Sequence, residues 1–181
     1  KPQRTSKESE IHQAAMLVSE GMLPQFELYN KDVTYFPAQR DDIIQGELIR
    51  TLTDDYESKF NTKLEDTVVL TPMNVGSVGT VALNKALKKI MNPSAQGSGL
   101  SFSGKGPFHV GDRIIINKNN NQKNISNGDV GVIDSINEKG TISLKLRNKE
   151  VELSGKERIA MDHAFCLSIH KTQGSEYGSV L

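Results

Sequence analysis

The sequence predicts an α/β domain built on a parallel sheet, with a small β-barrel of SH3 type inserted into it. Strand and helix patterns alternate as far as Pro93, and such alternation is typical of layered α/β domains. From Phe108 to about Glu152 only strand patterns occur, which indicates a small barrel. A buried strand pattern then returns at His163–Ile169, so the barrel interrupts the first domain. The predicted boundaries are 1–107 and 158–181 for the two parts of the α/β domain and 108–157 for the insertion.

Helices and strands are both predicted ahead of the insertion. The helices are indicated by apolar residues that recur every three to four positions, and the strands by short β-branched runs. The last helix ends at Asn92-Pro93, because a residue before proline avoids helical backbone angles. In chain order the predicted elements are a helix over 5–21, a strand over Val33–Phe36, a helix over 41–60, a buried strand over Thr67–Thr71 and a helix over 81–91.

The insertion is predicted from strand patterns that are separated by turn signals. Asn127-Gly128 and Lys139-Gly140 favour tight turns between neighbouring strands. Short strands that follow one another this closely suit a barrel better than a layered α/β domain. The strands are expected over 112–117, 129–136, 141–146 and 150–153.

The glycine-rich stretch ahead of the insertion, Gly99–Gly106, comes close to a phosphate-binding P-loop. Its last position is Gly106, where a P-loop has the Ser or Thr hydroxyl that holds magnesium. Pro107 and a strand follow, whereas a P-loop leads into a helix whose N-terminus faces the phosphate. We therefore interpret this stretch as a flexible linker, and expect no complete nucleotide-hydrolysing apparatus in this chain.

Composition narrows the class of protein. The chain has 181 residues and a formal net charge of zero, so any contact with nucleic acid must be local. A single cysteine, Cys166, excludes an internal disulfide and fits a reducing, cytoplasmic compartment. Apolar runs stay well short of the roughly 20 residues that span a membrane. The spacing of the His and Cys residues predicts no metal site.

The densest polar cluster is "SIHKTQGSEYGSV", Ser168 to Val180, which directly follows the buried strand. Ligands of open α/β sheets bind where strands end. Ser168, His170 and Lys171 can donate to phosphate oxygens. Gly174 permits close approach of a ligand to the backbone, and Glu176 can accept from a sugar hydroxyl. A solvated loop is the alternative. The Asn-rich run 117–124 leaves two readings open as well, a solvated hairpin loop or a loop on nucleic-acid backbone.

Four stretches resemble the RecD-like group of superfamily 1B DNA helicases. "SIHKTQGSEY" is similar to their motif V pattern, T-V-H-K-S-Q-G-S-E-F. "LTPMNVGSVGTVALNKALKKIMNP" resembles the motif IVa segment, and "FHVGDRIIINKNNNQKNISNGDVGVI" resembles the opening of the family's SH3-like insertion. "QRTSKESEIHQAAMLVSEGMLP" resembles the segment that places Arg4 on the motif IV arginine. The resemblance covers essentially the whole chain.

The resemblance implies the second RecA-like domain of an ATP-dependent 5′→3′ DNA helicase, from motif IV to motif V, with its SH3-like insertion. The partners would be single-stranded DNA and a first RecA-like domain that holds ATP and Mg²⁺. Without that domain the chain alone would be inactive. In the roles that the family assigns, Arg4 is catalytic and contacts the γ-phosphate, Gly174 lines the nucleotide cleft and Glu176 meets the ribose. The DNA backbone would be held by Thr71, Asn84, Ser168, His170 and Lys171.

Asn74 departs from the family pattern, which has Arg or Lys there, and this lowers the expected affinity for DNA. Two other interpretations compete. One is a helicase-derived module of a conjugative relaxase, which binds single-stranded DNA or serves as a secretion or recognition signal without hydrolysing ATP. The other is an SH3-type module for protein interaction, which rests on the insertion alone and would need an aromatic groove.

Overall fold

The computed structural model describes residues 9–38, 40–97, 99–173 and 175–181. The chain forms two compact units, Lys1–Gln39 and Arg40–Leu181, and each is described by itself. Within these ranges no helix is both long and apolar enough to cross a membrane.

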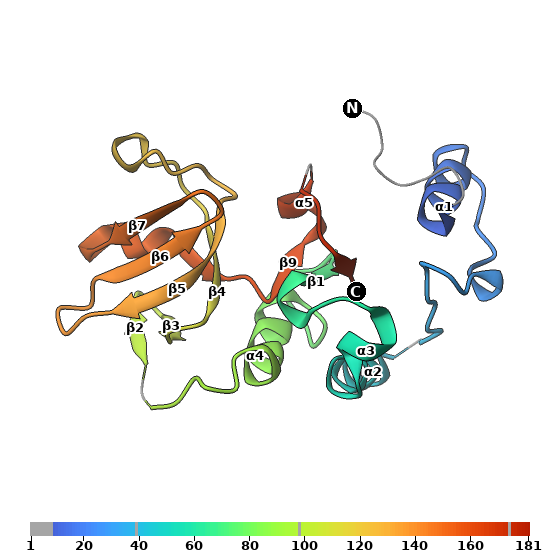
Figure 1. Cartoon of the computed structure of the whole chain (residues 1–181), viewed down its shortest axis with the longest axis horizontal. Coiled ribbons are helices and arrows are strands. Elements are labelled where there is room, and N and C mark those ends of the chain that lie inside the picture. Colours follow the sequence, from blue (N-terminus) through green and yellow to red (C-terminus); the bar gives the residue numbers. More distant parts are fainter. Residues whose placement is uncertain (1–8, 39, 98, 174) are drawn as a thin grey trace. The chain divides into compact units, whose positions relative to one another are not determined.

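The N-terminal unit contains helix α1 (Glu10–Ser19) and a short 3-10 turn, η1 (Phe26–Leu28) (Figure 1). The helix predicted over 5–21 is thus confirmed in its described part. The Glu10 carboxylate is buried, and it accepts hydrogen bonds from the backbone N–H groups of four residues in the segment 30–33, at 2.8 to 3.2 Å. Burial raises the pKa of Glu10, but these N–H groups outweigh it and lower the pKa below its usual value.

The strand predicted over Val33–Phe36 is wrong, because this described segment is irregular. The N–H groups leading into it point at the Glu10 carboxylate instead of at a neighbouring strand. A side chain therefore holds the backbone at the start of this β-branched and aromatic run, which the sequence pattern alone does not reveal.

The second unit begins with two helices, α2 (Asp41–Thr53) and α3 (Tyr56–Phe60), where the sequence predicts a single helix over 41–60. Asp55 interrupts the helix because it adopts a left-handed backbone conformation with φ of 51°. The apolar spacing nevertheless continues across the break, since Leu52 and Tyr56 are both buried in one core.

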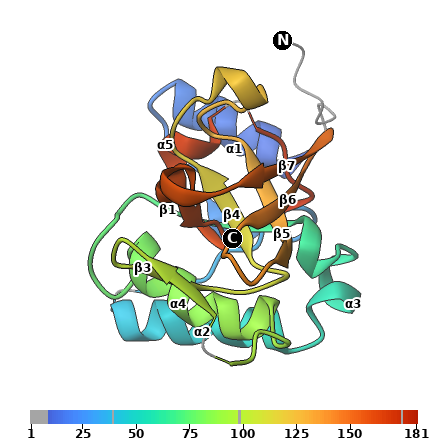
Figure 2. The same ribbon diagram turned by 90° about the vertical axis from the view of Figure 1, so that its left-hand side faces the viewer.

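A three-stranded parallel sheet forms the centre of this unit. Strand β1 (Thr67–Thr71) lies between β9 (Cys166–Ser168) and the short β10 (Ser179–Val180), and both neighbours run parallel to it. Figures 1 and 2 place α2 and α4 (Thr80–Met91) on one side of this sheet. A short helix, α5 (Ile169–Thr172), follows β9 directly. Buried residues of the shared core are Leu52, Tyr56, Val69, Leu83, Leu87, Phe165 and Cys166.

The inserted part is a five-stranded antiparallel sheet with β7 and β8 at its two edges. The strands are β4 (Arg113–Ile116), β5 (Val130–Ile136), β6 (Ile142–Leu146), β7 (Lys149–Leu153) and β8 (Met161–His163), in the order β7-β6-β5-β4-β8. Whereas the short 3-10 turn η2 (Leu64–Asp66) precedes β1 of the parallel sheet, η3 (Asn121–Lys123) and η4 (Gly155–Ala160) lie in the connections of the inserted part. Its core is aliphatic and aromatic, and consists of Phe108, Ile114, Ile116, Ile125, Ile133, Ile142, Leu144, Leu146, Leu153 and Met161. The predicted fold class, an α/β domain with an all-β insertion, is confirmed.

Two local predictions need correction. The stretch predicted as a flexible linker contains a hairpin of β2 (Leu100–Phe102) and β3 (Lys105–Phe108), and Phe102 stacks on Phe108 at the barrel core. The strand predicted over His163–Ile169 is divided, because β8 pairs with β4 of the insertion and β9 pairs with β1 of the parallel sheet. The antiparallel sheet thus extends to His163, while the domain boundaries themselves stay predictions.

Candidate nucleic-acid interface

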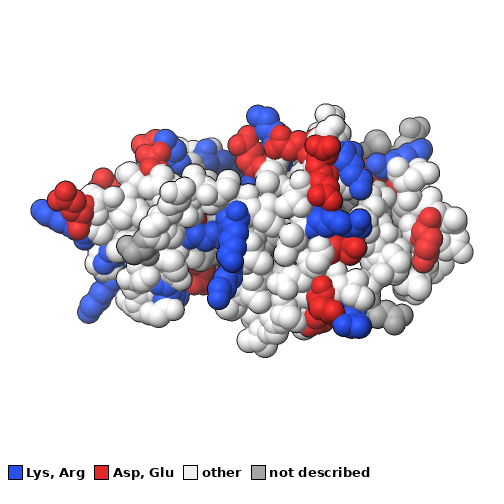
Figure 3. All heavy atoms as spheres, turned by 90° about the horizontal axis from the view of Figure 1, so that it is seen from below, with Lys and Arg blue, Asp and Glu red and all other residues white. Residues whose placement is uncertain are grey.

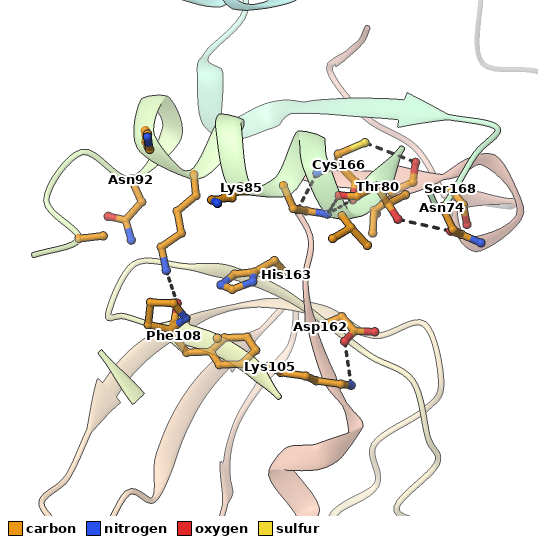
Figure 4. Close-up of a pocket in the computed structure, with 18 of the residues that line it drawn as sticks. Asn74, Thr80, Lys85, Asn92, Lys105, Phe108, Asp162, His163, Cys166 and Ser168 are labelled. Atoms are coloured by element: carbon orange, nitrogen blue, oxygen red, sulfur yellow. Dashed lines mark hydrogen bonds and ion pairs between the residues drawn. The ribbon is translucent and has the colours of Figure 1, made fainter. Parts of the chain in front are cut away.

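A groove of about 890 Å³ is lined by α4 and β9 and by residues around β3 and β8 of the inserted part. Figure 4 shows Lys85, Ser168 and Asp162 around it. Its lining is rich in ammonium groups, and Figure 3 shows basic side chains gathered near the middle of the face seen from below. The lining lysines are Lys85, Lys88, Lys89, Lys105 and Lys171.

The lysines of the groove differ in what they already bind. Lys88 is mostly buried and forms an ion pair of 2.5 Å with Asp112. Lys171 donates to the Asn117 side chain at 2.8 Å. Lys85 and Lys89, in contrast, are exposed and have no partner within the described part of the chain. These two ammonium groups are therefore the cations most accessible to an anionic ligand.

Helix α4 is held against the parallel sheet by Asn84. Its side-chain amide donates to the carbonyls of Thr80 and Cys166, each at 2.8 Å. Its oxygen accepts from the backbone N–H groups of Phe165 at 2.8 Å and Cys166 at 3.0 Å. Asn84 therefore fixes the position of α4 against β9, and both elements contribute residues to the lining of the groove. The contact with DNA that the resemblance implies for this residue stays a prediction.

We expect Asn84→Ala to lower the free energy of unfolding by about 2 kcal/mol, because the N–H groups of Phe165 and Cys166 and the Cys166 carbonyl lose their side-chain partner. Urea denaturation followed by far-ultraviolet circular dichroism would measure the loss. Asn148→Ala, at an exposed turn between β6 and β7, is the matched control and should change stability by less than about 0.5 kcal/mol. Equal effects of the two substitutions would contradict the role of Asn84 in holding α4 against the sheet.

Beneath the groove, α4 and the insertion are joined through the fully buried carboxylate of Asp112. One oxygen accepts from Lys88 Nζ at 2.5 Å, from the His109 backbone N–H at 2.8 Å and from His163 Nε2 at 3.2 Å. The other accepts from Asn92 Nδ2 at 2.8 Å. Burial raises the pKa of Asp112, but the bonds from His163, Lys88, Asn92 and His109 outweigh it and lower the pKa below its usual value.

His163, predicted to be structural, has that role here. Its ring stacks on Phe108 with centroids 4.4 Å apart, and its Nε2 faces Asp112. Cys166 also lines the groove, but burial raises the pKa of its thiol to about 12, so it stays protonated at neutral pH and is a poor nucleophile. Within the described ranges no three His, Cys, Asp or Glu residues are placed to hold a metal ion.

Thr71 and Ser168 are paired in register at the carboxyl edge of the parallel sheet. The Thr71 hydroxyl is buried and is used within the protein, since it donates to the Val78 carbonyl at 2.8 Å. It also accepts from the Met73 N–H at 3.3 Å, which fixes the loop after β1. Ser168 forms part of the groove lining. The structure therefore places Thr71 behind the groove and Ser168 on it.

His170 and Lys171 follow on α5 and are both exposed. Lys171 lines the groove, whereas His170 lies outside its lining. Of the residues predicted for the nucleotide, Arg4 and Gly174 lie outside the described residues. Glu176 is exposed and lines a separate hollow of about 350 Å³ with Arg113. The contacts predicted with DNA and nucleotide for these residues stay predictions.

Sequence reasoning missed the residues that give the groove its electrostatic character. Lys85 and Lys89 belong to "NKALKK", and they are four positions apart, so one face of the helix carries both. This spacing is the signal that could have found them. Asp112 and Asp162 carry no such signal, because their significance depends on partners that are distant in sequence.

Residues 83–147 match the family described as the ATP-dependent RecD-like DNA helicase SH3 domain. The ATP-dependent RecD2 DNA helicase of Deinococcus radiodurans is 33% identical over 113 residues, which make up 62% of this chain and 15% of that protein. The chain thus spans a small part of this relative's length.

Solved structures with some likeness include the Pif1 helicase from Bacteroides in complex with ADP-AlF3 and ssDNA. That comparison has 13% identity, covers 99% of this chain and 52% of that chain, and has a TM-score of 0.47. The Bacteroides Pif1 bound to ssDNA has 14% identity over 82% of this chain and 44% of that chain, with a TM-score of 0.39. The match to the SH3 domain and the identity to RecD2 confirm the resemblance to RecD-like helicases seen in the sequence, and residues 83–147 are similar to the SH3 domain of these enzymes.

Proposed function

We propose that the groove binds the sugar-phosphate backbone of single-stranded DNA as part of the second motor domain of an ATP-dependent 5′→3′ DNA helicase. The observation that carries the proposal is the pair of lysines without a partner in the described part of the chain, Lys85 and Lys89, which line one groove together with Ser168 and Lys171. Ammonium and hydroxyl donors of this kind hold phosphates without reading the sequence of bases. Such tolerance suits a protein that moves along a strand.

The charge distribution supports a local contact. The net charge of the chain is zero, so attraction of DNA to the molecule as a whole is weak. Inside the groove, lysines outnumber carboxylates among the described lining residues, so its lining carries a net positive charge. Affinity should therefore come from a few phosphate contacts and should fall steeply with salt.

The second part of the proposal concerns ATP. We assign to this chain the role of completing the ATP site of a first RecA-like domain, with Arg4 at the γ-phosphate, Gly174 in the cleft and Glu176 at the ribose. The exposure of Glu176 is compatible with a ligand supplied from outside this chain. ATP and Mg²⁺ would be held mainly by the first domain, and the direction of movement follows from the family resemblance.

The DNA part is tested by fluorescence anisotropy of labelled oligo-dT and oligo-dC across a salt series. We expect binding in the micromolar range or weaker, equal for both oligonucleotides. The logarithm of affinity should fall with the logarithm of salt concentration with a slope of about −0.7 for each phosphate held. An affinity that does not change with salt concentration, or an absence of binding at low salt, would contradict the groove as a DNA site.

A further inference from the structure

One acidic side chain interrupts the positive lining of the groove. Among the described residues that line it, Asp162 is the only one with a carboxylate. Asp162 belongs to β8, at the edge of the inserted sheet. Its Oδ1 accepts from Lys105 Nζ at 2.8 Å, the contact drawn in Figure 4. Its Oδ2 accepts from Asn117 Nδ2 at 2.5 Å and lies 4.0 Å from Lys171 Nζ. One carboxylate therefore faces two lysines of the groove.

These contacts are open to water. The side chains of Asp162 and Lys171 are each 41% exposed, and that of Lys105 is 32% exposed. Ion pairs at this exposure contribute little to stability, so an incoming anion can replace one partner without a large penalty. A phosphodiester oxygen and a carboxylate oxygen are equivalent partners for an ammonium group, since both are anionic acceptors.

We propose that Asp162 is an internal competitor of the DNA phosphates, occupying Lys105 and Lys171 when DNA is absent and repelling the backbone when it is present. This inference rests on the proposed function of the groove. Asp162 would set the affinity of the groove below the value that its lysines alone would give. A low affinity shortens the time for which each phosphate is held, because differences in affinity appear mainly in the dissociation rate.

The alternative is a purely structural role. Asp162 and Lys171 both bind the Asn117 side chain, and this network ties α5 to the inserted sheet. A structural role predicts that loss of the carboxylate loosens the groove and weakens binding. The competitor role predicts the opposite sign. A gain of affinity is also an outcome that poor folding of a variant cannot produce.

The test compares wild type, Asp162→Asn and Asp134→Asn in oligo-dT binding by fluorescence anisotropy at several salt concentrations. Asp134 is the matched control, because it has the same charge, pairs with Lys145 and has a side chain 40% exposed, but lies outside the groove lining. We expect Asp162→Asn to bind about threefold to tenfold more tightly, from the removal of one charge close to a bound phosphate. Asp134→Asn should stay within about twofold of wild type.

A second variant identifies the cation that is released. Lys171→Met should weaken binding more strongly in the Asp162→Asn background than in wild type, because only then does no carboxylate of the groove lining compete with phosphate for the ammonium group. Equal or weaker binding by Asp162→Asn than by Asp134→Asn, while wild type binds, would overturn the competitor role and leave the DNA groove standing. An absence of binding by all three proteins would overturn the groove itself, and the competitor role with it.

Discussion

Asp112→Ala is expected to destabilise the second unit by about 3–5 kcal/mol, the range measured when one partner of a buried ion pair is removed. The carboxylate is fully buried, and Lys88, its partner, has only 15% of its side chain exposed. Without Asp112, the Lys88 ammonium group keeps only the carbonyl of Pro107 at 2.6 Å and the His109 ring as partners among the described residues. Asn92 and the His109 N–H also lose an acceptor.

Urea denaturation of the whole chain would measure this loss. Asp134→Ala is the control, because its ion pair with Lys145 is exposed, and its effect should stay below about 1 kcal/mol. A loss of less than about 1 kcal/mol for Asp112→Ala would show that the buried ion pair contributes little to holding the insertion against α4.

The hydrogen bonds to Asp112 also make the stability of the fold depend on pH, and the lowered pKa of Asp112 sets the direction of this dependence. The pKa of Asp112 is lower in the folded protein than the value of about 3.9 in an unfolded chain. Its charged form therefore stabilises the fold fully above about pH 4, and this contribution is lost as the pH falls through the lower, folded pKa. The difference in stability between wild type and Asp112→Ala should accordingly shrink between about pH 5 and pH 2. A difference that is constant over this range would contradict the lowered pKa.

The second large effect is expected on DNA affinity. Replacing both Lys85 and Lys89 by alanine should reduce binding to oligo-dT by about tenfold at low salt. The slope of log affinity against log salt should become shallower by about 0.7 for each phosphate that the variant no longer holds. Stability should change little, because both side chains are exposed and have no partner in the described part of the chain.

Lys139→Ala is the matched control for this pair. Lys139 is exposed in the turn between β5 and β6, and lies outside the lining of the groove. Its replacement should leave both the affinity and the salt slope unchanged. If the double variant at positions 85 and 89 kept the wild-type slope, DNA would be held elsewhere, and the Asn-rich loop 117–124 would become the leading candidate.

Local periodicity predicted most of the elements correctly, since helix and strand patterns report which face of an element is buried. It failed where a single residue or a partner distant in sequence determines the backbone conformation. The left-handed Asp55 divides a continuous helical pattern, and the Glu10 carboxylate binds the backbone N–H at the start of a segment that resembles a strand. The strand pattern over 163–169 hides a change of partner between two sheets, which hydrophobicity does not record.

The site was predictable only in outline. The position of Ser168 at a strand end and of Lys171 beside it follows from the order of elements, and the structure places both on the groove. Asp112 and Asp162 act through partners that the fold brings in from other strands and helices. The sequence pattern around a carboxylate in a strand is the same whether the carboxylate faces water, forms an ion pair or repels a ligand.

The passage from the insertion back to the parallel sheet consists of two residues, Ala164 and Phe165, and both are buried. It is fastened at both ends: the Ala164 N–H donates to the Arg113 carbonyl at 2.9 Å, and the Phe165 N–H is held by Asn84. The Arg113 guanidinium adds bonds to the carbonyls of Thr67 and Leu64 at 2.6 and 2.7 Å. The connection is therefore short and hydrogen-bonded at both of its residues. We expect a displacement of β9 to carry β8 with it, because these bonds would otherwise have to break.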